Sequence, residues 1–380
     1  MTTDPRRAGI DPALWIGLIS GTSIDGIDAV LADFGTNGHP RTLLALTHPW
    51  PDALRNRLLE FSQGTAPFDL DRYGETDVAV GEAFADAALA VLARSGHGAA
   101  QVRAIGSHGQ TLRHRPDGHW PFTLQIGDPT VIAERTGIDV IADFRRADVA
   151  AGGQVAPLLP ALHAMLLAAP GHVRAVLNLG GIGNLTVLDA DGGVTGFDTG
   201  PANGLLDAWC LRHRGTAFDR DGRFAAAGQV DAALLDALLA DPYFARPAPK
   251  STGREYFHLA WLERHAPLAG LNPADVQATL LELSARSIAE AVAAHAPAAE
   301  QVIACGGGVH NRLLMERLAA RLAPCPLTTT AAFGIDPDYL EATAFAWLAR
   351  QRLHDAPGNL PAVTGARGPR VLGAWHRAPH

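Results

Sequence analysis

The chain has 380 residues, of which 47% are hydrophobic and 18% are charged. This length exceeds one typical hydrophobic core and so predicts two domains. The composition predicts a soluble globular enzyme and excludes a disordered chain. The formal net charge of −8 argues against nucleic acid and anionic membranes as partners. We expect no signal peptide and no membrane span, and the three cysteines, which lack ligand spacing, predict buried thiols in a reducing cytoplasm.

The first half of the chain alternates predicted strands and helices. A hairpin over 15–34 and a third strand over 42–49 precede helical patterns over 52–61 and 75–93. A strand over 102–108 then runs into a polar loop. Two short strands, 122–126 and 139–144, flank a helix that starts at Asp128 and Pro129.

The second half repeats this order. A helix around 157–168 precedes a hairpin over 175–188 and a third strand that ends near residue 201. Further helices are predicted over 205–211, 230–239, 273–294, 312–322 and 339–353, with a strand over 301–305. Such alternation predicts an α/β fold in which helices cover the sheets.

Each half carries a glycine-rich hairpin turn between apolar strands. The first turn runs from Gly21 to Gly26 and the second from Gly180 to Asn184. Glycine lets backbone N–H groups approach an oxyanion, and hydroxyl side chains add donors, so the pair predicts a polyphosphate held between two similar lobes. Two ordinary β-hairpins are the alternative. A Walker-type loop is excluded because the only lysine, Lys250, lies in neither turn.

A further glycine turn and several polar residues follow predicted strands. The Gly306–Gly308 turn opens a helix, where a nucleotide or simply a tight turn would fit. Asp198 ends a strand and could accept a proton from a hydroxyl or a water. Asp143 also ends a strand, but a neighbouring arginine would pair with it, and His108 in its polar loop is as readily structural as catalytic.

Together these segments resemble the anhydro-N-acetylmuramic acid kinase family, which belongs to the sugar kinase, heat-shock chaperone and actin superfamily. The matching segments run in family order from about residue 15 to residue 347; they are 19–28, 107–111, 125–129, 142–145, 152–154, 178–184, 197–201, 249–255 and 305–311. Ala202 and Val155 depart from the family pattern, which commonly has glycine at both positions. These two departures affect the expected fit of the substrate rather than the reaction.

The resemblance implies a two-lobed, actin-like ATPase (ribonuclease H-like) fold, with a mixed sheet and flanking helices in each lobe and the active site in the interlobe cleft. Residues 1–145 and 345–380 would form the first lobe and residues 146–344 the second. The family also implies a cytoplasmic homodimer.

The family reaction uses ATP and Mg²⁺ to phosphorylate O6 of 1,6-anhydro-N-acetylmuramic acid while water opens the anhydro bridge at C1. By resemblance Asp198 is the general base, and Glu341 would act at the sugar or the water. Asp25, in the first glycine turn, could hold Mg²⁺ through water. A turn-forming Asp25 and a helix-start Glu341 are the alternatives. The residues expected to bind ATP and its phosphates are Gly21, Thr22, Ser23, Ile24, Asp25, Gly26, Ile27, Asp28, Gly180, Gly181, Gly183, Asn184, Gly306, Gly307, Gly308 and Asn311. Those expected to bind the sugar are His108, Gln110, Asp128, Asp143, Arg145 and Asp198.

Two other functions remain open on the sequence alone. A related kinase acting on an ordinary sugar or on acetate would need a base for the substrate hydroxyl but no hydrolytic water. A sugar sensor of this superfamily would often carry a DNA-binding helix-turn-helix before the first hairpin. An actin-like scaffold would need neither the polar loop at His108 nor the carboxylate of Asp198.

Overall fold

The computed structural model describes residues 14–379 except 22–23, 36–37, 64–68, 117, 155–157, 249, 254–255, 266–267 and 269. Contacts within the chain divide it into two compact units. The first comprises residues 1–162 and 339–380, and the second comprises residues 163–338. The division falls within helix α5 (Leu159–Leu167). Each unit contains its own sheet and its own apolar cluster.

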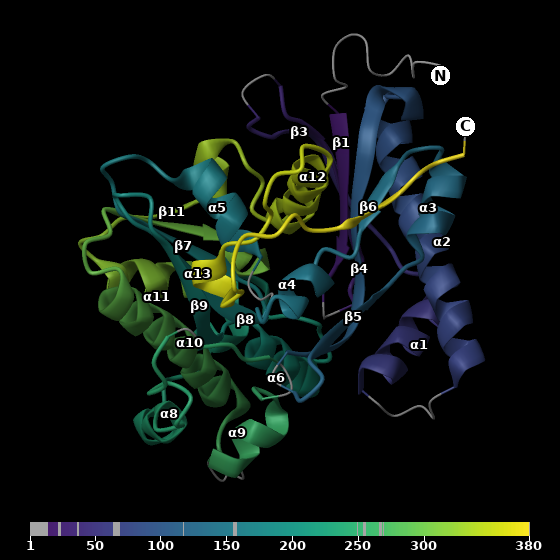
Figure 1. Ribbon diagram of the computed structural model, residues 1–380. Coiled ribbons are helices and arrows are strands. Elements are labelled where there is room, and N and C mark those ends of the chain that lie inside the picture. The colour runs from purple at the N-terminus through teal and green to yellow at the C-terminus, as the bar shows by residue number, and fades with distance from the viewer. Residues whose placement is uncertain are drawn as a thin grey trace. The chain divides into compact units, whose positions relative to one another are not determined.

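The first unit is built on a mixed sheet (Figure 1). Its strands are β1 (Leu14–Ser20), β2 (Ile27–Asp33), β3 (Arg41–His48), β4 (Val102–Arg115), β5 (Phe122–Ile126), β6 (Val140–Ala142) and β12 (Ala374–His376). Their order is β12-β6-β4-β1-β2-β3, with β5 paired to β4. The chain-order neighbours β1, β2 and β3 are antiparallel, whereas β4 lies parallel to both β1 and β6.

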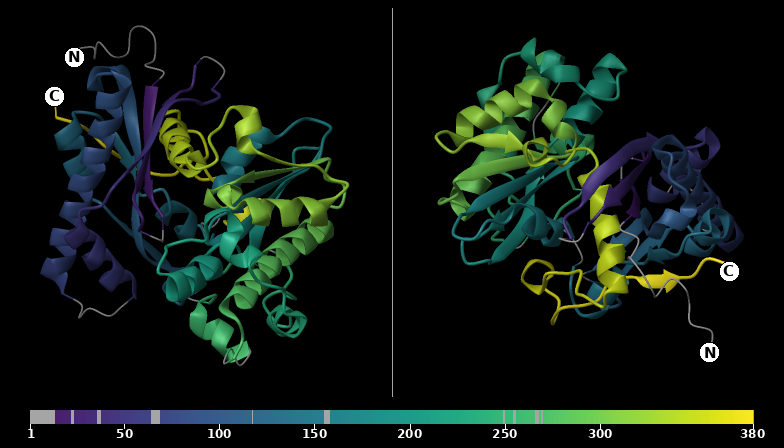
Figure 2. Two further views of the ribbon diagram at one scale, coloured as in Figure 1. Left: turned by 180° about the vertical axis from the view of Figure 1, so that it is seen from behind. Right: turned by 90° about the horizontal axis from the view of Figure 1, so that it is seen from above.

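Helices cover both faces of this sheet. The helices of this unit are α1 (Asp52–Gln63), α2 (Leu70–Ser95), α3 (Pro129–Thr136), α4 (Arg146–Ala150), α12 (Leu340–Leu353) and α13 (Pro361–Thr364), with a 3₁₀ turn at Ala99–Gln101. Figures 1 and 2 show α2 and α3 on one face and α12 on the other. Alternate strand residues explain this, since Ile16 and Leu18 join the apolar cluster of α2 while Gly17 faces α12.

Helix α12 approaches the sheet at two glycines. A Cβ atom at Gly17 would lie 1.8 Å from the carbonyl oxygen of Ala342, and one at Gly106 would lie 2.0 Å from that of Phe345. Both contacts are to helix backbone, so only glycine allows the helix to pack this closely. The first turn of α12, which carries Glu341, is thereby fixed against β1 and β4.

The second unit is built on a five-stranded mixed sheet, counted over its described residues. The strands are β7 (Arg174–Leu179), β8 (Ile182–Leu188), β9 (Val194–Pro201), β10 (Gln301–Cys305) and β11 (Leu327–Thr329), and their order is β11-β10-β7-β8-β9. As in the first unit, a run of three antiparallel strands (β7, β8 and β9) joins parallel neighbours.

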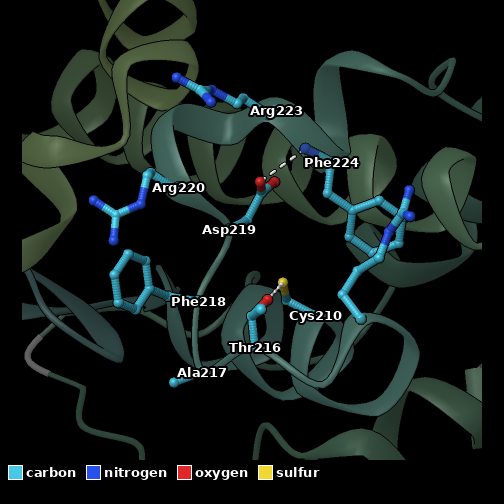
Figure 3. A pocket seen from close by; sticks show the side chains of 9 residues that line it. Cys210, Thr216, Ala217, Phe218, Asp219, Arg220, Arg223 and Phe224 are labelled. Carbon is cyan, nitrogen blue, oxygen red and sulfur yellow. Dashed lines mark hydrogen bonds between the residues drawn. The ribbon is translucent and has the colours of Figure 1, made fainter.

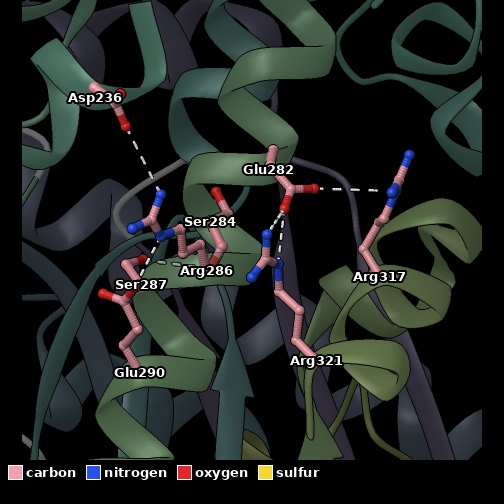
Figure 4. Close-up of polar contacts among 8 residues, drawn as sticks. All are labelled: Asp236, Glu282, Ser284, Arg286, Ser287, Glu290, Arg317 and Arg321. Carbon is pink, nitrogen blue, oxygen red and sulfur yellow. Dashed lines mark hydrogen bonds and ion pairs between the residues drawn. The ribbon is translucent and has the colours of Figure 1, made fainter. Parts of the chain in front are cut away.

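The helices of this unit are α6 (Gly204–Arg214), α7 (Arg223–Ala226), α8 (Ala232–Leu239), α9 (Leu259–His265), α10 (Pro273–His295) and α11 (Arg312–Leu322). Short 3₁₀ turns lie at Arg220–Gly222, Gly307–His310 and Thr330–Phe333. Helix α10 packs on the apolar face of the sheet. Figure 4 shows Glu282 of α10 between Arg317 and Arg321 of α11; the Nε atom of Arg321 donates to Glu282 at 2.7 Å. These ion pairs join α11, the helix that follows the Gly306–Gly308 turn, to α10.

The predicted α/β fold, with a mixed sheet and flanking helices in each of two parts, is confirmed. The polar loop predicted after residue 108 is wrong, because β4 continues to Arg115. Its far end is hydrogen-bonded to β5, and Gly109, with φ of 74°, accommodates the irregularity in the strand. Among the described residues, no helix combines the length and apolar character that a membrane span requires.

Candidate active site

Asp198 lies near the end of β9 in the second unit and is only 6% exposed. Its carboxylate is held from two directions: the backbone N–H of Thr252 donates to Oδ2 at 2.9 Å, and the Asn184 side-chain amide donates to Oδ1. An ionised carboxylate accepts hydrogen bonds and can accept a proton. A buried carboxylate fixed in this way suits a general base whose orientation does not change between turnovers.

Polar residues form a row across this sheet. The strand register places Asn178 of β7 opposite Asn184 of β8, and Asn184 opposite Asp198 of β9. Hydrogen bonds from one side chain to the next follow the same row, with 3.4 Å between Asn178 Nδ2 and Asn184 Oδ1. The side chain of Asn184, which we expected to bind phosphate, therefore contacts Asp198.

The second glycine turn is held by the start of α6. Asn203 donates through its backbone N–H to the carbonyl oxygen of Gly180 at 3.0 Å, and Gly204 donates to that of Gly181 at 2.9 Å. These hydrogen bonds hold the turn against the start of α6. A Cβ atom at Gly183 would lie 2.6 Å from Thr199 Oγ1, so the hairpin packs tightly behind the turn.

The Gly306–Gly308 turn packs against the same hairpin. Gly306 has a φ of 81°, and its added Cβ would lie 2.4 Å from Asn178 Oδ1. At Gly308 it would lie 2.5 Å from Asn203 Nδ2. At Gly307 it would meet none of the described atoms within 4 Å. The middle glycine thus leaves open space, as a turn that receives a flat ring would require.

Asn311 caps α11 through its side chain, which accepts from Leu314 N at 3.2 Å. The same side-chain oxygen would lie 2.7 Å from a Cβ at Gly222, so the 3₁₀ turn before α7 packs on this cap.

Figure 3 shows the carboxylate of Asp219 directed at the backbone N–H of Phe224, to which it is hydrogen-bonded at 2.8 Å. Beside this segment lies a cavity of about 470 Å³ lined by Cys210 and Phe218.

The first glycine turn lies in the first unit, where Thr22 and Ser23 fall outside the described residues. Ile24 N–H donates to the carbonyl oxygen of Gly21 at 3.2 Å, and Ile24 has a φ of 56°, a conformation that a β-branched residue rarely adopts. Gln110 of β4 donates from Nε2 to the same Gly21 oxygen at 3.2 Å. Gln110, expected to bind the sugar, therefore supports this turn.

Asp25 and Asp28 differ in their surroundings. The Asp25 side chain is 75% exposed, and Arg55 approaches it at 3.8 Å. Asp28 accepts a hydrogen bond from Thr47 Oγ1 at 2.7 Å. Among the described residues, no three acidic, histidine or cysteine side chains gather as metal ligands. An exposed single carboxylate still fits Mg²⁺, which keeps most of its waters and binds few protein ligands.

A second polar cluster of the first unit joins His108, Arg145 and Glu341. Arg145 Nε donates to His108 Nε2 at 2.8 Å, and His108 Nδ1 lies 3.0 Å from the carbonyl oxygen of Gly109. A carbonyl only accepts, so Nδ1 carries the proton and the ring is neutral. Burial, followed by the charge of Arg145, holds the pKa of His108 well below its usual value. With both ring nitrogens engaged, His108 orients Arg145.

Burial also lowers the pKa of Arg145 to about 10, while the nearby carboxylate of Glu341 acts in the opposite direction. Glu341 thus lies close enough to interact electrostatically with the guanidinium.

The remaining two candidates, Asp128 and Asp143, have local roles. Asp128 caps α3 and accepts from Thr130 N at 2.8 Å. Asp143 has a φ of 59° and lies 3.6 Å from Arg146 Nε, so Arg146 rather than Arg145 is its ion-pair partner. Burial raises the pKa of Asp143, and Arg146 opposes that shift. His376 of β12 interacts electrostatically with both carboxylates.

Sequence reasoning missed three contributors to the site. Thr252 acts through its backbone, Asn203 links two glycine turns, and Tyr243 donates its hydroxyl to the carbonyl oxygen of Asp198 at 2.7 Å. Thr252 lies inside a segment that matched the family, so that match was the available signal. Val155 lies outside the described residues, and Ala202 is fully buried beside the second turn.

Comparison with known proteins gives consistent results. A family model described as anhydro-N-acetylmuramic acid kinase matches residues 13–378. A curated protein of that name from Xanthomonas campestris pv. campestris (strain 8004) is 58% identical over 367 residues, covering 96% of this chain and 97% of the relative. One from Coxiella burnetii (strain Dugway 5J108-111) is 49% identical over 364 residues, covering 95% and 96%.

Solved structures are more distant. A xylulose kinase from Rhodospirillum rubrum is 16% identical with a TM-score of 0.43, and 93% of each chain is covered. A ROK hexokinase from Thermus thermophilus is 20% identical with a TM-score of 0.36, covering 89% of this chain and 99% of that one.

Proposed function

Because the chain belongs to the anhydro-N-acetylmuramic acid kinase family, we propose that it transfers phosphate from ATP to O6 of 1,6-anhydro-N-acetylmuramic acid. In the same reaction water opens the 1,6-anhydro bridge, and the product is N-acetylmuramic acid 6-phosphate. The observation that carries this proposal is the buried, oriented carboxylate of Asp198. An ordinary sugar kinase also needs a base, so the water is the distinguishing feature.

In this mechanism Asp198 accepts a proton from water as the water oxygen bonds to C1. The C1–O6 bond breaks, O6 takes the electron pair, and O6 then attacks the γ-phosphorus of ATP while ADP leaves. Phosphoryl transfer depends mainly on alignment and on neutralising negative charge. Mg²⁺ would supply part of that charge, with Asp25 as its proposed ligand through water. The glycine turns would supply backbone N–H groups to the phosphates.

The first unit would contribute the sugar contacts. We propose that Arg145, oriented by His108, binds a polar group of the substrate. Guanidinium groups bind carboxylates strongly, and this sugar carries a carboxylate. We assign Glu341 a supporting role next to Arg145. The cytoplasmic location and the homodimer expected from the family remain predictions; light scattering on the purified protein tests the dimer.

The test uses ¹⁸O-labelled water. The chain is incubated with ATP, Mg²⁺ and the anhydro sugar, and the product is analysed by mass spectrometry. We expect a gain of both phosphate and water, with the label at C1. A phosphorylated product that keeps its anhydro bridge, or that gains no label, would favour the ordinary kinase. If the protein leaves the anhydro sugar unchanged but phosphorylates a common hexose, the proposed substrate is contradicted.

A further inference from the structure

An irregular segment of the second unit makes three hydrogen bonds with Asp198. Residues 241–252 form neither helix nor strand over their described part. At one end of this segment the Tyr243 hydroxyl donates to the Asp198 carbonyl oxygen at 2.7 Å. At the other end Lys250 O accepts from Asp198 N at 2.9 Å, and Thr252 N donates to the carboxylate at 2.9 Å. The position of Asp198 therefore depends on what holds this segment in shape.

The Tyr243 end is anchored by Asp241, a buried carboxylate. Its Oδ1 accepts from Tyr243 N and from the Tyr256 hydroxyl, each at 2.8 Å. Its Oδ2 accepts from Trp261 Nε1 at 2.8 Å and lies 3.1 Å from His265 Nε2. Burial would raise the pKa of Asp241, but these hydrogen bonds hold it below its usual value. The Phe257 ring contacts the rings of Tyr243, Tyr256 and Trp261 and so packs the same region.

The Lys250 end is tied to that anchored end by its own side chain. Lys250 Nζ donates to the carbonyl oxygens of Tyr243 and Phe244, each at 3.2 Å. The same ammonium lies 4.7 Å from the centre of the Tyr243 ring, where a cation is attracted to the aromatic face. One side chain thus connects the two parts of the segment that contact Asp198.

Composition supports a specific requirement for lysine. The chain has 31 lysine and arginine residues together, and Lys250 is the only lysine. An ammonium is compact and directs its donors tetrahedrally, so it can serve two adjacent carbonyl oxygens and a ring face at once. A guanidinium is planar and wider, and its parallel donors suit carboxylates. The single lysine of a chain that otherwise uses arginine thus stands at the position where these contacts favour an ammonium.

We propose that Lys250 is a positioning residue for the reaction: its ammonium holds the 241–252 segment closed, and the segment in turn orients the Asp198 carboxylate. This inference rests on the proposed function in so far as Asp198 is the base that activates water. It assigns Lys250 no direct contact with substrate.

The first test compares Lys250→Met and Lys250→Arg with Arg246→Met. Arg246 is the matched control, since it lies exposed in the same segment and also places a cation near the Tyr243 ring, at 5.9 Å. We expect both Lys250 variants to lose about 10- to 100-fold in kcat, because small displacements of a reacting group are costly. The KM for ATP should change by less than about twofold. Because a loss of folded protein would also lower the apparent kcat at constant KM, the variants are compared at equal concentrations of folded protein, checked by thermal melts. Arg246→Met should keep the wild-type kcat.

The second test keeps the sequence intact. Reductive dimethylation of the wild-type protein changes Lys250 and the N-terminal amine, retains the positive charges, and leaves Nζ with a single N–H donor. Lys250→Arg treated in the same way controls for the N-terminus. We expect the modified wild type to lose kcat and the modified variant to lose nothing further. Full activity in dimethylated wild type, or in Lys250→Arg, would overturn the proposal.

Amide hydrogen exchange separates this inference from the proposed function. We expect peptides covering 243–252 to exchange faster in Lys250→Met than in wild type or Arg246→Met. A wild type that leaves the anhydro sugar unchanged would contradict the function, whereas unchanged exchange in Lys250→Met would contradict the role of Lys250 by itself.

Discussion

The hydrogen bonds around Asp198 determine what a conservative change there would do. In Asp198→Asn one carboxylate oxygen becomes an NH₂ group, which faces either the Thr252 N–H or the Asn184 amide. We expect turnover to fall by about 10²–10⁴-fold, because the base is lost. Nucleotide affinity should stay near the wild-type value. Steady-state assays and titration calorimetry measure the two effects, and activity within a few-fold of wild type would remove Asp198 from the role of base.

Buried His163 makes a prediction about stability and pH. Its Nδ1 lies 2.9 Å from Thr186 Oγ1, and burial lowers its pKa from 6.5 to about 3. Between these two pH values the unfolded chain binds a proton at His163 that the folded chain does not, so the free energy of unfolding decreases as the pH falls below 6.5. At pH 5 proton binding at His163 would lower the free energy of unfolding by about 2 kcal/mol.

The control for this effect is His163→Gln, which cannot titrate. We expect wild type to lose more of its free energy of unfolding than the variant when urea denaturation at pH 7 is compared with pH 5. Identical pH dependence in the two proteins would mean that the buried imidazole becomes protonated without unfolding.

At the scale of elements, the three glycines of the turn between β10 and α11 have different surroundings. Gly306 and Gly308 pack against neighbouring residues, whereas Gly307 borders open space. Gly308→Ala would place a Cβ 2.6 Å from Leu179 Cβ and 2.5 Å from Asn203 Nδ2, so we expect a loss of about 1–3 kcal/mol in stability. Gly307→Val meets open space. It should melt close to wild type yet bind ATP at least about tenfold more weakly, because the side chain fills the expected nucleotide space.

Thermal melts and calorimetry on both variants test this contrast. An unchanged ATP affinity in Gly307→Val would place the nucleotide elsewhere, and a stable Gly308→Ala would show that Asn203 can move aside.

At the scale of the whole molecule, the two units differ in continuity. Residues 163–338 form a continuous stretch with a sheet and an apolar cluster of their own, whereas the first unit needs residues 339–380 to complete it. Without residues 339–380 the first unit lacks α12, so one face of β1 and β4 loses its cover, and it lacks β12, the strand that pairs with β6. A fragment of 159–338 should therefore unfold cooperatively in urea, and a fragment of 1–158 should not.

Near-UV circular dichroism and urea titration of the two fragments give the measurement. A cooperative 1–158 fragment would show that α12 is dispensable for the sheet, and an unfolded 159–338 fragment would show that the second unit depends on the first.

Several features were determined by the sequence alone because their causes lie within a few residues. Asn311 both ends a glycine turn and caps α11, so the start of that helix at Arg312 was predictable. The same holds for α3, where Asp128 caps and a proline follows. Helix α2 was predicted from residue 75 but begins at Leu70, and the unused signal was its cap, Asp69. The order of motifs likewise identified the family.

Only the tertiary structure decided how distant segments share a hydrogen bond. The strand β4 continues through His108 because β5 pairs with its far end, and His108 is a neutral, orienting residue because Arg145 donates to it. Asp198 is held by Thr252, far along the chain, through a backbone N–H that no side-chain pattern reveals. Caps and turns depend on local sequence, but such contacts require two separately folded segments to pack together, and packing is set by the whole unit.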